Sequence, residues 1–149
     1  MENLFANKPF VAAFVAVVTA QLLKTIFNLI IDGEFNLKRA ASTGGMPSSH
    51  AATVVALSTS IGMLHGIESP LFAIAIVFSI IVIYDAVGIR QAAGKHAKML
   101  NEWSKILSEI YENGIQPANL KTLLGHNYPQ VLAGSGLGLL IGYLVTIYL

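Results

Sequence analysis

The chain contains no cysteine and few charged residues, and both features narrow the classes of protein to which it can belong. The lack of cysteine excludes disulfide bonds, thiol catalysis and cysteine-ligated metal sites. Only 11% of the 149 residues are charged and 54% are hydrophobic, whereas an average soluble domain has about 25% charged residues. The net charge of +1 gives no electrostatic basis for binding nucleic acid. The composition therefore indicates an integral membrane protein of one small domain.

Long uncharged stretches predict four membrane-spanning helices, because about 20 apolar residues cross the hydrocarbon core of a bilayer. The predicted spans cover residues 9–31, 47–64, 70–89 and 128–149. The first is too long for a removable signal peptide, and it carries Gln21 and Lys24 where a small-residue cleavage site would be expected. We therefore expect it to remain in the membrane.

Residues 91–113 have a different character from the spans. Apolar residues, among them Trp103, recur there at three- and four-residue steps with lysine and glutamate between them. This pattern is typical of an amphipathic helix, which we expect to lie on the membrane surface or against the bundle. The predicted fold is all-α: a polytopic membrane bundle of four transmembrane helices plus one cytoplasmic or interfacial amphipathic helix, in a single domain over residues 1–149.

Small residues form a stripe along one face of the last span, at Gly134, Gly138 and Gly142, and the second span carries a similar stripe. Small residues four positions apart let helices approach one another closely. Both stripes are predicted to be packing surfaces, either inside the bundle or between protomers. The glycine stripe is the candidate face for a homodimer.

The basic residues predict which side of the membrane faces the cytoplasm. With four spans, the first and third connections lie on one side, and both termini lie on the other. The connections carry most of the lysines and arginines, whereas the terminal side carries only Lys8. The positive-inside rule therefore predicts a multi-pass protein of the cell membrane with cytoplasmic connections and both termini outside.

Residues 44–50, Gly-Gly-Met-Pro-Ser-Ser-His, are the strongest functional signal in the chain. Two glycines free the backbone, and Pro47 can start a helix because the N–H it lacks would have no partner there. The free N–H groups of a first helical turn and the positive end of the helix dipole favour an anion. An uncharged span follows His50. This turn is therefore predicted to bind phosphate at a membrane surface, which suggests a lipid head group.

Other polar residues are predicted to converge on the same cytoplasmic side. His126 opens the last span as His50 opens the second, and Lys24 and Asp85 lie in the halves of their spans nearest that side. Hydrolysis of a phosphate monoester without a metal requires a nucleophile, an acid, cations and hydrogen-bond donors. The two histidines can supply the first two functions, since imidazole titrates near neutral pH.

Cationic side chains and hydrogen-bond donors are also needed, to neutralise the phosphate and to bind its oxygens. The candidates are Lys24, Arg90, Lys95, Ser48, Ser49 and the N–H groups after Gly45. Asp85 is either the ion-pair partner of Lys24 or Arg90, or a part of the catalytic machinery. No metal and no cofactor is predicted.

Two stretches resemble motifs of the type 2 phosphatidic acid phosphatase and vanadium haloperoxidase superfamily. Residues 47–50, Pro-Ser-Ser-His, look like its Pro-Ser-Gly-His motif, and residues 125–134 resemble its third motif, in which a histidine leads into a helix start. The whole chain is similar to the divergent bacterial branch described as acid phosphatase/vanadium-dependent haloperoxidase-related. The signatures of that branch occur here at residues 44–51, 85–90 and 124–126.

The resemblance implies a membrane phosphatase that acts on a lipid phosphate, with His126 as the nucleophile forming a phosphohistidine. It implies that His50 is the general acid and that Ser49 binds phosphate. The chain departs from the superfamily pattern in three places. Lys24 is the only stand-in for the first motif, Leu120 occupies the position of an expected arginine, and Gln130 replaces a carboxylate.

These departures keep two other functions open. An amide at position 130 can orient an imidazole but cannot stabilise its cation, which favours a non-catalytic membrane protein that binds phosphate or phospholipid. The other alternative is a small oligomeric transporter with Lys24 and Asp85 as an intramembrane relay, because ionisable residues inside spans are costly and usually functional.

Overall fold

The computed structural model describes residues 4–32, 45–110, 119–122 and 124–149, and every regular element in these residues is helical. This confirms the predicted all-α class. The elements in chain order are the 3-10 turn η1 (Leu4–Ala6), α1 (Lys8–Asp32), α3 (Ser49–His65), α4 (Pro70–Tyr84), the π-helical turn η2 (Asp85–Ile89), α5 (Arg90–Ile110) and α6 (Tyr128–Tyr148). Residues 33–44, with Lys38 and Arg39, lie outside the described residues.

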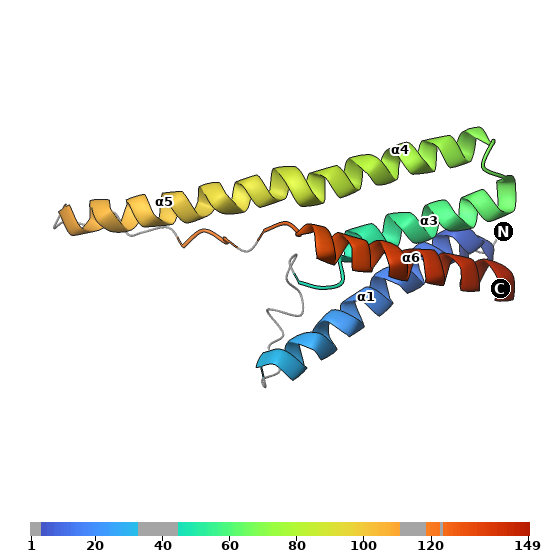
Figure 1. The fold of residues 1–149 in the computed structure, drawn as a ribbon, viewed down its shortest axis with the longest axis horizontal. Helices are drawn as coiled ribbons and strands as arrows, with labels where there is room; N and C mark the ends of the chain where they lie inside the picture. The colour runs from blue at the N-terminus through green and yellow to red at the C-terminus, as the bar shows by residue number, and fades with distance from the viewer. Residues whose placement is uncertain (1–3, 33–44, 111–118, 123) are drawn as a thin grey trace.

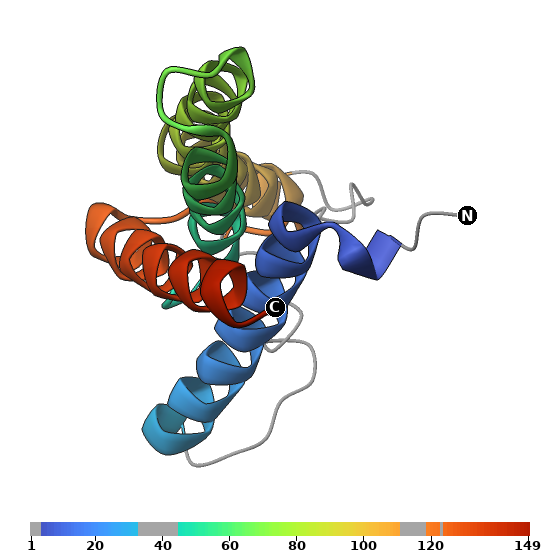
Figure 2. The ribbon, with the colours of Figure 1, turned by 90° about the vertical axis from the view of Figure 1, so that its right-hand side faces the viewer.

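The helix α3 is the centre of the bundle and contacts α1, α4 and α6. Viewed along the bundle, α1 and α4 lie on different sides of α3, and α6 completes the group (Figure 2). The helix α1 crosses the others at an angle, so its C-terminal end diverges from them (Figure 1). The core consists mainly of small residues, which allows the helix backbones to approach closely. Its fully buried members include Ala12, Ala16, Ala20, Ala52 and Ala56.

The glycine stripe of α6 packs against α3 inside one chain. A β-carbon at Gly138 would come 2.5 Å from the carbonyl oxygen of Ala52, and Gly134 and Gly142 meet the carbonyl oxygens of Ser48 and Ala56 in the same way. All three glycines are buried. This face is therefore a packing surface inside one chain, which is one of the two roles predicted for it, and it is covered by α3.

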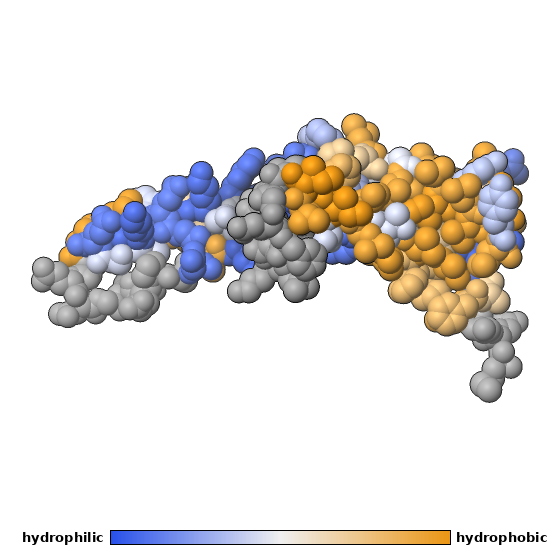
Figure 3. All heavy atoms as spheres, turned by 90° about the horizontal axis from the view of Figure 1, so that it is seen from below, coloured by the Kyte–Doolittle hydropathy of each residue, from blue (hydrophilic) through white to orange (hydrophobic). Residues whose placement is uncertain are grey.

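Three stretches of the described chain are long and apolar enough to cross a membrane: Lys8–Ile30, Pro70–Ile110 and Tyr128–Tyr148. The helix α3 has only 17 residues. Large apolar side chains are exposed over α1, α4 and α6, and Figure 3 shows this apolar surface over the bundle, with polar residues over much of α5. An exposed surface of this extent is expected of a protein that faces lipid.

The predicted third span and the predicted amphipathic helix form one continuous rod, Pro70–Ile110. Its 41 residues correspond to about 60 Å of helix, twice the roughly 30 Å core of a bilayer. Figure 1 shows α5 extending beyond the other helices, in line with α4. The expectation that α5 lies against the bundle is therefore wrong. The sequence changes from apolar to amphipathic where the rod extends beyond the other helices, and the helix itself continues without a break.

The returning segment 119–122 runs along α5 before the chain enters α6. The side-chain amide of Asn101 donates to the carbonyl of Leu120 at 2.9 Å, and its oxygen accepts the N–H of Leu120 at 3.0 Å. At Gly94 the segment comes so close that a β-carbon would lie 2.6 Å from the carbonyl oxygen of Thr122. These contacts direct the chain back to the start of α6.

Candidate active site

Two histidines from distant parts of the sequence lie side by side where α3 and α6 begin. The rings of His50 and His126 have centroids 5.8 Å apart and planes inclined by 62°. The N–H of Ser48 donates to the carbonyl of Gln130 at 2.9 Å, so main-chain contact joins the two helix starts. The start of α1 and the end of α6 lie at the other end of the bundle (Figure 1), where Lys8 donates to the carbonyl of Thr146 at 3.2 Å.

The starts of both helices carry side-chain caps. The hydroxyl of Ser48 is fully buried and accepts the N–H of Ala51 at 3.4 Å. At α6, Asn127 accepts the N–H of Gln130, while the Gln130 side chain accepts the N–H of Asn127. Such caps satisfy some of the N–H groups of a first turn. The positive end of each helix dipole is thereby directed at the space around the two imidazoles.

A buried cation from α1 reaches the start of α3. Lys24 is only 1% exposed, and its ammonium group donates to the hydroxyl of Ser49 at 3.4 Å. That hydroxyl in turn donates to the side-chain oxygen of Gln21 at 2.7 Å. Gly45, with φ +96°, lies against the aliphatic part of Lys24. A lysine held inside a membrane helix is costly and usually marks a functional site.

The π-helical turn η2 positions the backbone of His126. The N–H of Arg90 donates to the carbonyl of Asp85, five residues back, so it does not use the carbonyl of Ala86. The Ala86 carbonyl accepts the N–H of His126 at 2.9 Å instead. Gly125, with φ +82°, touches the rod so closely that a β-carbon would lie 2.6 Å from the N–H nitrogen of Gln91. Isolated π turns inside α-helices are frequent at functional sites for this kind of reason.

The side chain of Gln130 determines the tautomer of His126. Its oxygen accepts the N–H of Asn127 at 3.1 Å and lies 3.3 Å from Nδ1 of His126. An amide oxygen only accepts hydrogen bonds, so the proton is assigned to Nδ1 from these partners, and Nε2 keeps its lone pair. Burial lowers the pKa of His126 below its ordinary value, although the hydrogen bond with Gln130 and an interaction with the backbone of Gly45 act in the opposite direction. The imidazole is therefore neutral at pH 7.

Two imidazole nitrogens in this cluster are buried and have no hydrogen-bond partner among the described residues: Nδ1 of His50 and Nε2 of His126. Buried polar atoms without partners are rare in native structures. Here they belong to the two rings that adjoin one another beside the Lys24–Ser49 contact. The arrangement can take an oxyanion between a nucleophilic nitrogen, a second imidazole and a cation.

The remaining predicted residues occupy less central positions. Asp85 forms an ion pair with Arg90, Nε to Oδ2 at 2.6 Å, and both side chains are partly exposed. Asp85 therefore pairs with Arg90 and not with Lys24. Lys24, Asp85 and Arg90 are all close enough to act electrostatically on His50. Lys95 is exposed on α5 and is not brought into contact with the histidines by any interaction in the described chain.

Two site groups were not predicted from the sequence. Gln21 was noted only as an argument against a cleavage site, although a glutamine three residues before a lysine in an apolar span places two polar groups on one helix face. The carbonyl of Ala86 was missed because no sequence signal distinguishes a π turn from the α-helix around it.

The chain belongs to the Divergent PAP2 family, whose model matches residues 5–141. It is 34% identical over 148 residues to the uncharacterized membrane protein YuiD of Bacillus subtilis. That alignment covers 93% of this chain and 94% of the relative. No solved structure matches the chain. The resemblance found in the motifs is thus confirmed at the level of the family.

Proposed function

We propose that this membrane protein is a metal-independent phosphatase that hydrolyses a lipid phosphate monoester through a phosphohistidine. The observation that carries the proposal is the pair of adjacent imidazoles, each with a buried nitrogen that has no hydrogen-bond partner in the described chain. Membership of a PAP2-related family supports the same class of reaction.

In the proposed mechanism the phosphate binds between Lys24, the hydroxyl of Ser49 and the N–H groups at the start of α3, which neutralise its oxygens. The lone pair on Nε2 of His126 attacks phosphorus, and the bond from phosphorus to the lipid oxygen breaks. His50 in its protonated form gives its proton to that oxygen, so the lipid leaves as an alcohol.

The second half-reaction restores the protein. A water molecule gives a proton to His50 and attacks the phosphohistidine, and the bond between phosphorus and Nε2 breaks. Inorganic phosphate leaves, His126 regains its lone pair, and His50 again carries a proton. Gln130 holds the ring of His126 in the required orientation throughout. Asp85 acts through its ion pair with Arg90, which keeps the guanidinium near His50.

We further propose that α3 crosses the membrane as a fourth span. Its 17 residues give about 26 Å of helix, slightly less than the hydrocarbon core, and the other helices cover much of it. With four crossings, the positive-inside rule puts the site on the cytoplasmic side and both termini outside. The substrate would then enter from the cytoplasmic leaflet.

Phosphate release from a panel of lipid monophosphates tests the proposal. We expect turnover by the wild-type protein, inhibition by vanadate, and loss of turnover in His126→Ala and His50→Ala. His96→Ala is the control, because His96 is an exposed histidine on α5 that does not line the cavity between α1, α3 and α4. Absence of release from the whole panel would contradict the proposal.

A second function, phosphate or phospholipid binding without turnover, is favoured by one observation. The group beside Nδ1 of His126 is an amide and not a carboxylate, so it orients the ring but does not stabilise a positive charge on it. This function predicts that vanadate binds to the wild-type protein and to His126→Asn equally, with no phosphate released by either.

A further inference from the structure

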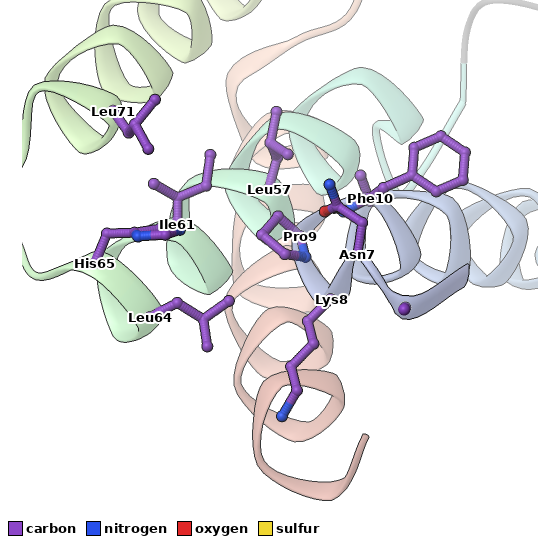
Figure 4. Close-up of a pocket in the computed structure, with 11 residues that line it drawn as sticks. Asn7, Lys8, Pro9, Phe10, Leu57, Ile61, Leu64, His65 and Leu71 are labelled. Atoms are coloured by element: carbon purple, nitrogen blue, oxygen red, sulfur yellow. The ribbon is translucent and has the colours of Figure 1, made fainter. Parts of the chain in front are cut away.

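A cavity of about 690 Å³ lies at the opposite end of the bundle from the histidines (Figure 4). Its walls come from the start of α1, the end of α3 and the start of α4, and they are mainly apolar. The volume falls within the range of about 300–1,000 Å³ that is typical of ligand sites. The α3 residues that line it are Leu57, Ile61, Leu64 and His65.

The cavity and the candidate active site lie on the same face of α3. Leu57, Ile61 and Leu64 follow one another at steps of four and three residues, and the same steps taken backwards lead to Thr53 and His50. The side chains of His50, Thr53, Leu57 and Ile61 are all half-buried, which is expected of a face that is open between two neighbouring helices.

The helix α1 shows the same relation. Ala13 lines the cavity, and steps of four residues lead from it through Val17 to Gln21, which accepts the hydroxyl of Ser49. Lys24 lies on that face one turn further on. Because α1 and α4 lie on different sides of α3 (Figure 2), this face of α3 lies between them, with the candidate active site toward one end and the cavity toward the other.

We propose that this face of α3, between α1 and α4, holds the hydrocarbon chain of the lipid whose phosphate occupies the active site. This inference rests on the proposed function and adds to it a binding site for the chain. One end of the face offers the buried cation Lys24 and the hydroxyl of Ser49 to a phosphate. The other end offers a mainly apolar cavity at the start of α1, the end of α3 and the start of α4. A lipid that carries a phosphate at one end and an uncharged hydrocarbon chain at the other is complementary to these two ends.

The helix rise fixes the length of chain that such a site would favour. Leu57 is about 10 Å and Leu64 about 21 Å along α3 from His50, at 1.5 Å per residue. A chain that ends within the first 10 Å therefore does not enter the cavity, whereas one that spans a full leaflet, about 15 Å, passes Leu57 and enters it. Selectivity for long over short chains follows from this geometry.

The test compares binding of alkyl monophosphates with 8 and 16 carbons to the full-length protein in detergent, measured by competition with vanadate. Ile61→Trp fills the cavity without touching the phosphate site. We expect it to weaken binding of the 16-carbon compound about tenfold, the cost of displacing about two methylene groups, and to leave the 8-carbon compound unchanged. Ile80→Trp is the control, because Ile80 is an exposed isoleucine on α4 that does not line the cavity.

A second measurement uses the wild-type protein and therefore does not require that a variant folds. A 16-carbon monophosphate with a photoreactive diazirine on its last carbon is expected to label residues 57–65 of α3 or residues 9–13 of α1, in competition with the unmodified compound. Equal binding of both chain lengths, or labelling spread over the outer face of α4, would overturn the inference and leave the phosphate site intact. Binding of neither compound would overturn the proposed function as well.

Discussion

The side-chain oxygen of Gln130 lies 3.3 Å from Nδ1 of His126 and is held there by the N–H of Asn127. The Asn127 N–H requires an acceptor, so the amide oxygen and not the amide nitrogen faces the imidazole. The proton of His126 is thereby directed to Nδ1, and Nε2 is left with a lone pair. Gln130 thus orients the imidazole as a carboxylate would, but it supplies no negative charge.

Gln130→Glu is expected to increase catalysis by the proposed mechanism. A carboxylate at this place stabilises the positive imidazole that forms during attack, so we expect phosphate release to rise about tenfold. The pH midpoint of His126, followed by NMR of its ring, should move upward by about one to two pH units. Gln130→Ala is the control and should lower release, because it removes the orientation as well. An unchanged midpoint in the glutamate variant would contradict the hydrogen-bond assignment.

The stability of the fold should depend on the protonation of His126. Burial lowers the pKa of His126 in the folded protein, whereas in the unfolded chain it is about 6.5. Between those two values the unfolded chain binds more protons, so the free energy of unfolding decreases as the pH falls below about 6.5 and is at its full value above it. Thermal unfolding in detergent between pH 8 and pH 5 measures this. The decline should be shallower in His126→Asn, and an identical slope would exclude His126 as its source.

Lys24→Met should weaken phosphate binding strongly. The ammonium group is the buried cation at the start of α3, and a charged hydrogen bond contributes about 1.5–3 kcal/mol, which corresponds to a loss of affinity of about 10- to 100-fold. Vanadate binding measures the loss. Lys8→Met is the matched control, since Lys8 lies at the other end of α1 and donates to Thr146. Similar losses in both variants would show that the effect is not local to the site.

Gly125→Ala should displace His126 and destabilise the fold, both by backbone strain and by a steric clash. Gly66→Ala is the control that has the backbone strain alone. Both glycines have positive φ, +82° and +80°, so a side chain at either strains the backbone by about 1–2 kcal/mol. Only at Gly125 does a β-carbon also meet the backbone of Gln91 and Ala86, since nothing lies within 4 Å at Gly66. We expect Gly125→Ala to be the more destabilising in thermal unfolding and the only one of the two to impair vanadate binding.

The sequence predicted the helical class and the neighbouring histidines because both depend on local signals. Long apolar runs fix the helices. Proline and cap residues at the starts of the second and last predicted spans put His50 in the first turn of one helix and His126 just before the first turn of the other, and the predicted count of spans put both on one side. The centroid distance of 5.8 Å agrees with that expectation. Their chemical roles stay predictions.

Features that depend on tertiary contact were not predictable in this way. The predicted division between a span at 70–89 and a separate helix from residue 91 failed in the described part, where Pro70–Ile110 is one continuous rod, because a change in hydropathy does not interrupt backbone hydrogen bonds. The glycine stripe of α6 is equally suitable for α3 of the same chain or for a second copy, and only the fold decides between them. Gln21 and Ala86 contribute to the site through contacts with segments far away in the sequence.

The glycine stripe also has a consequence for the spacing of the two imidazoles. Gly134, Gly138 and Gly142 leave no side chain between α6 and the backbone of α3, and the N–H of Ser48 is bonded directly to the carbonyl of Gln130. The separation of the helix starts is therefore set by main-chain atoms in contact, which have no alternative rotamers. Changes in the lipid-facing side chains can alter what the helices meet in the membrane while the geometry of the histidine pair stays constant.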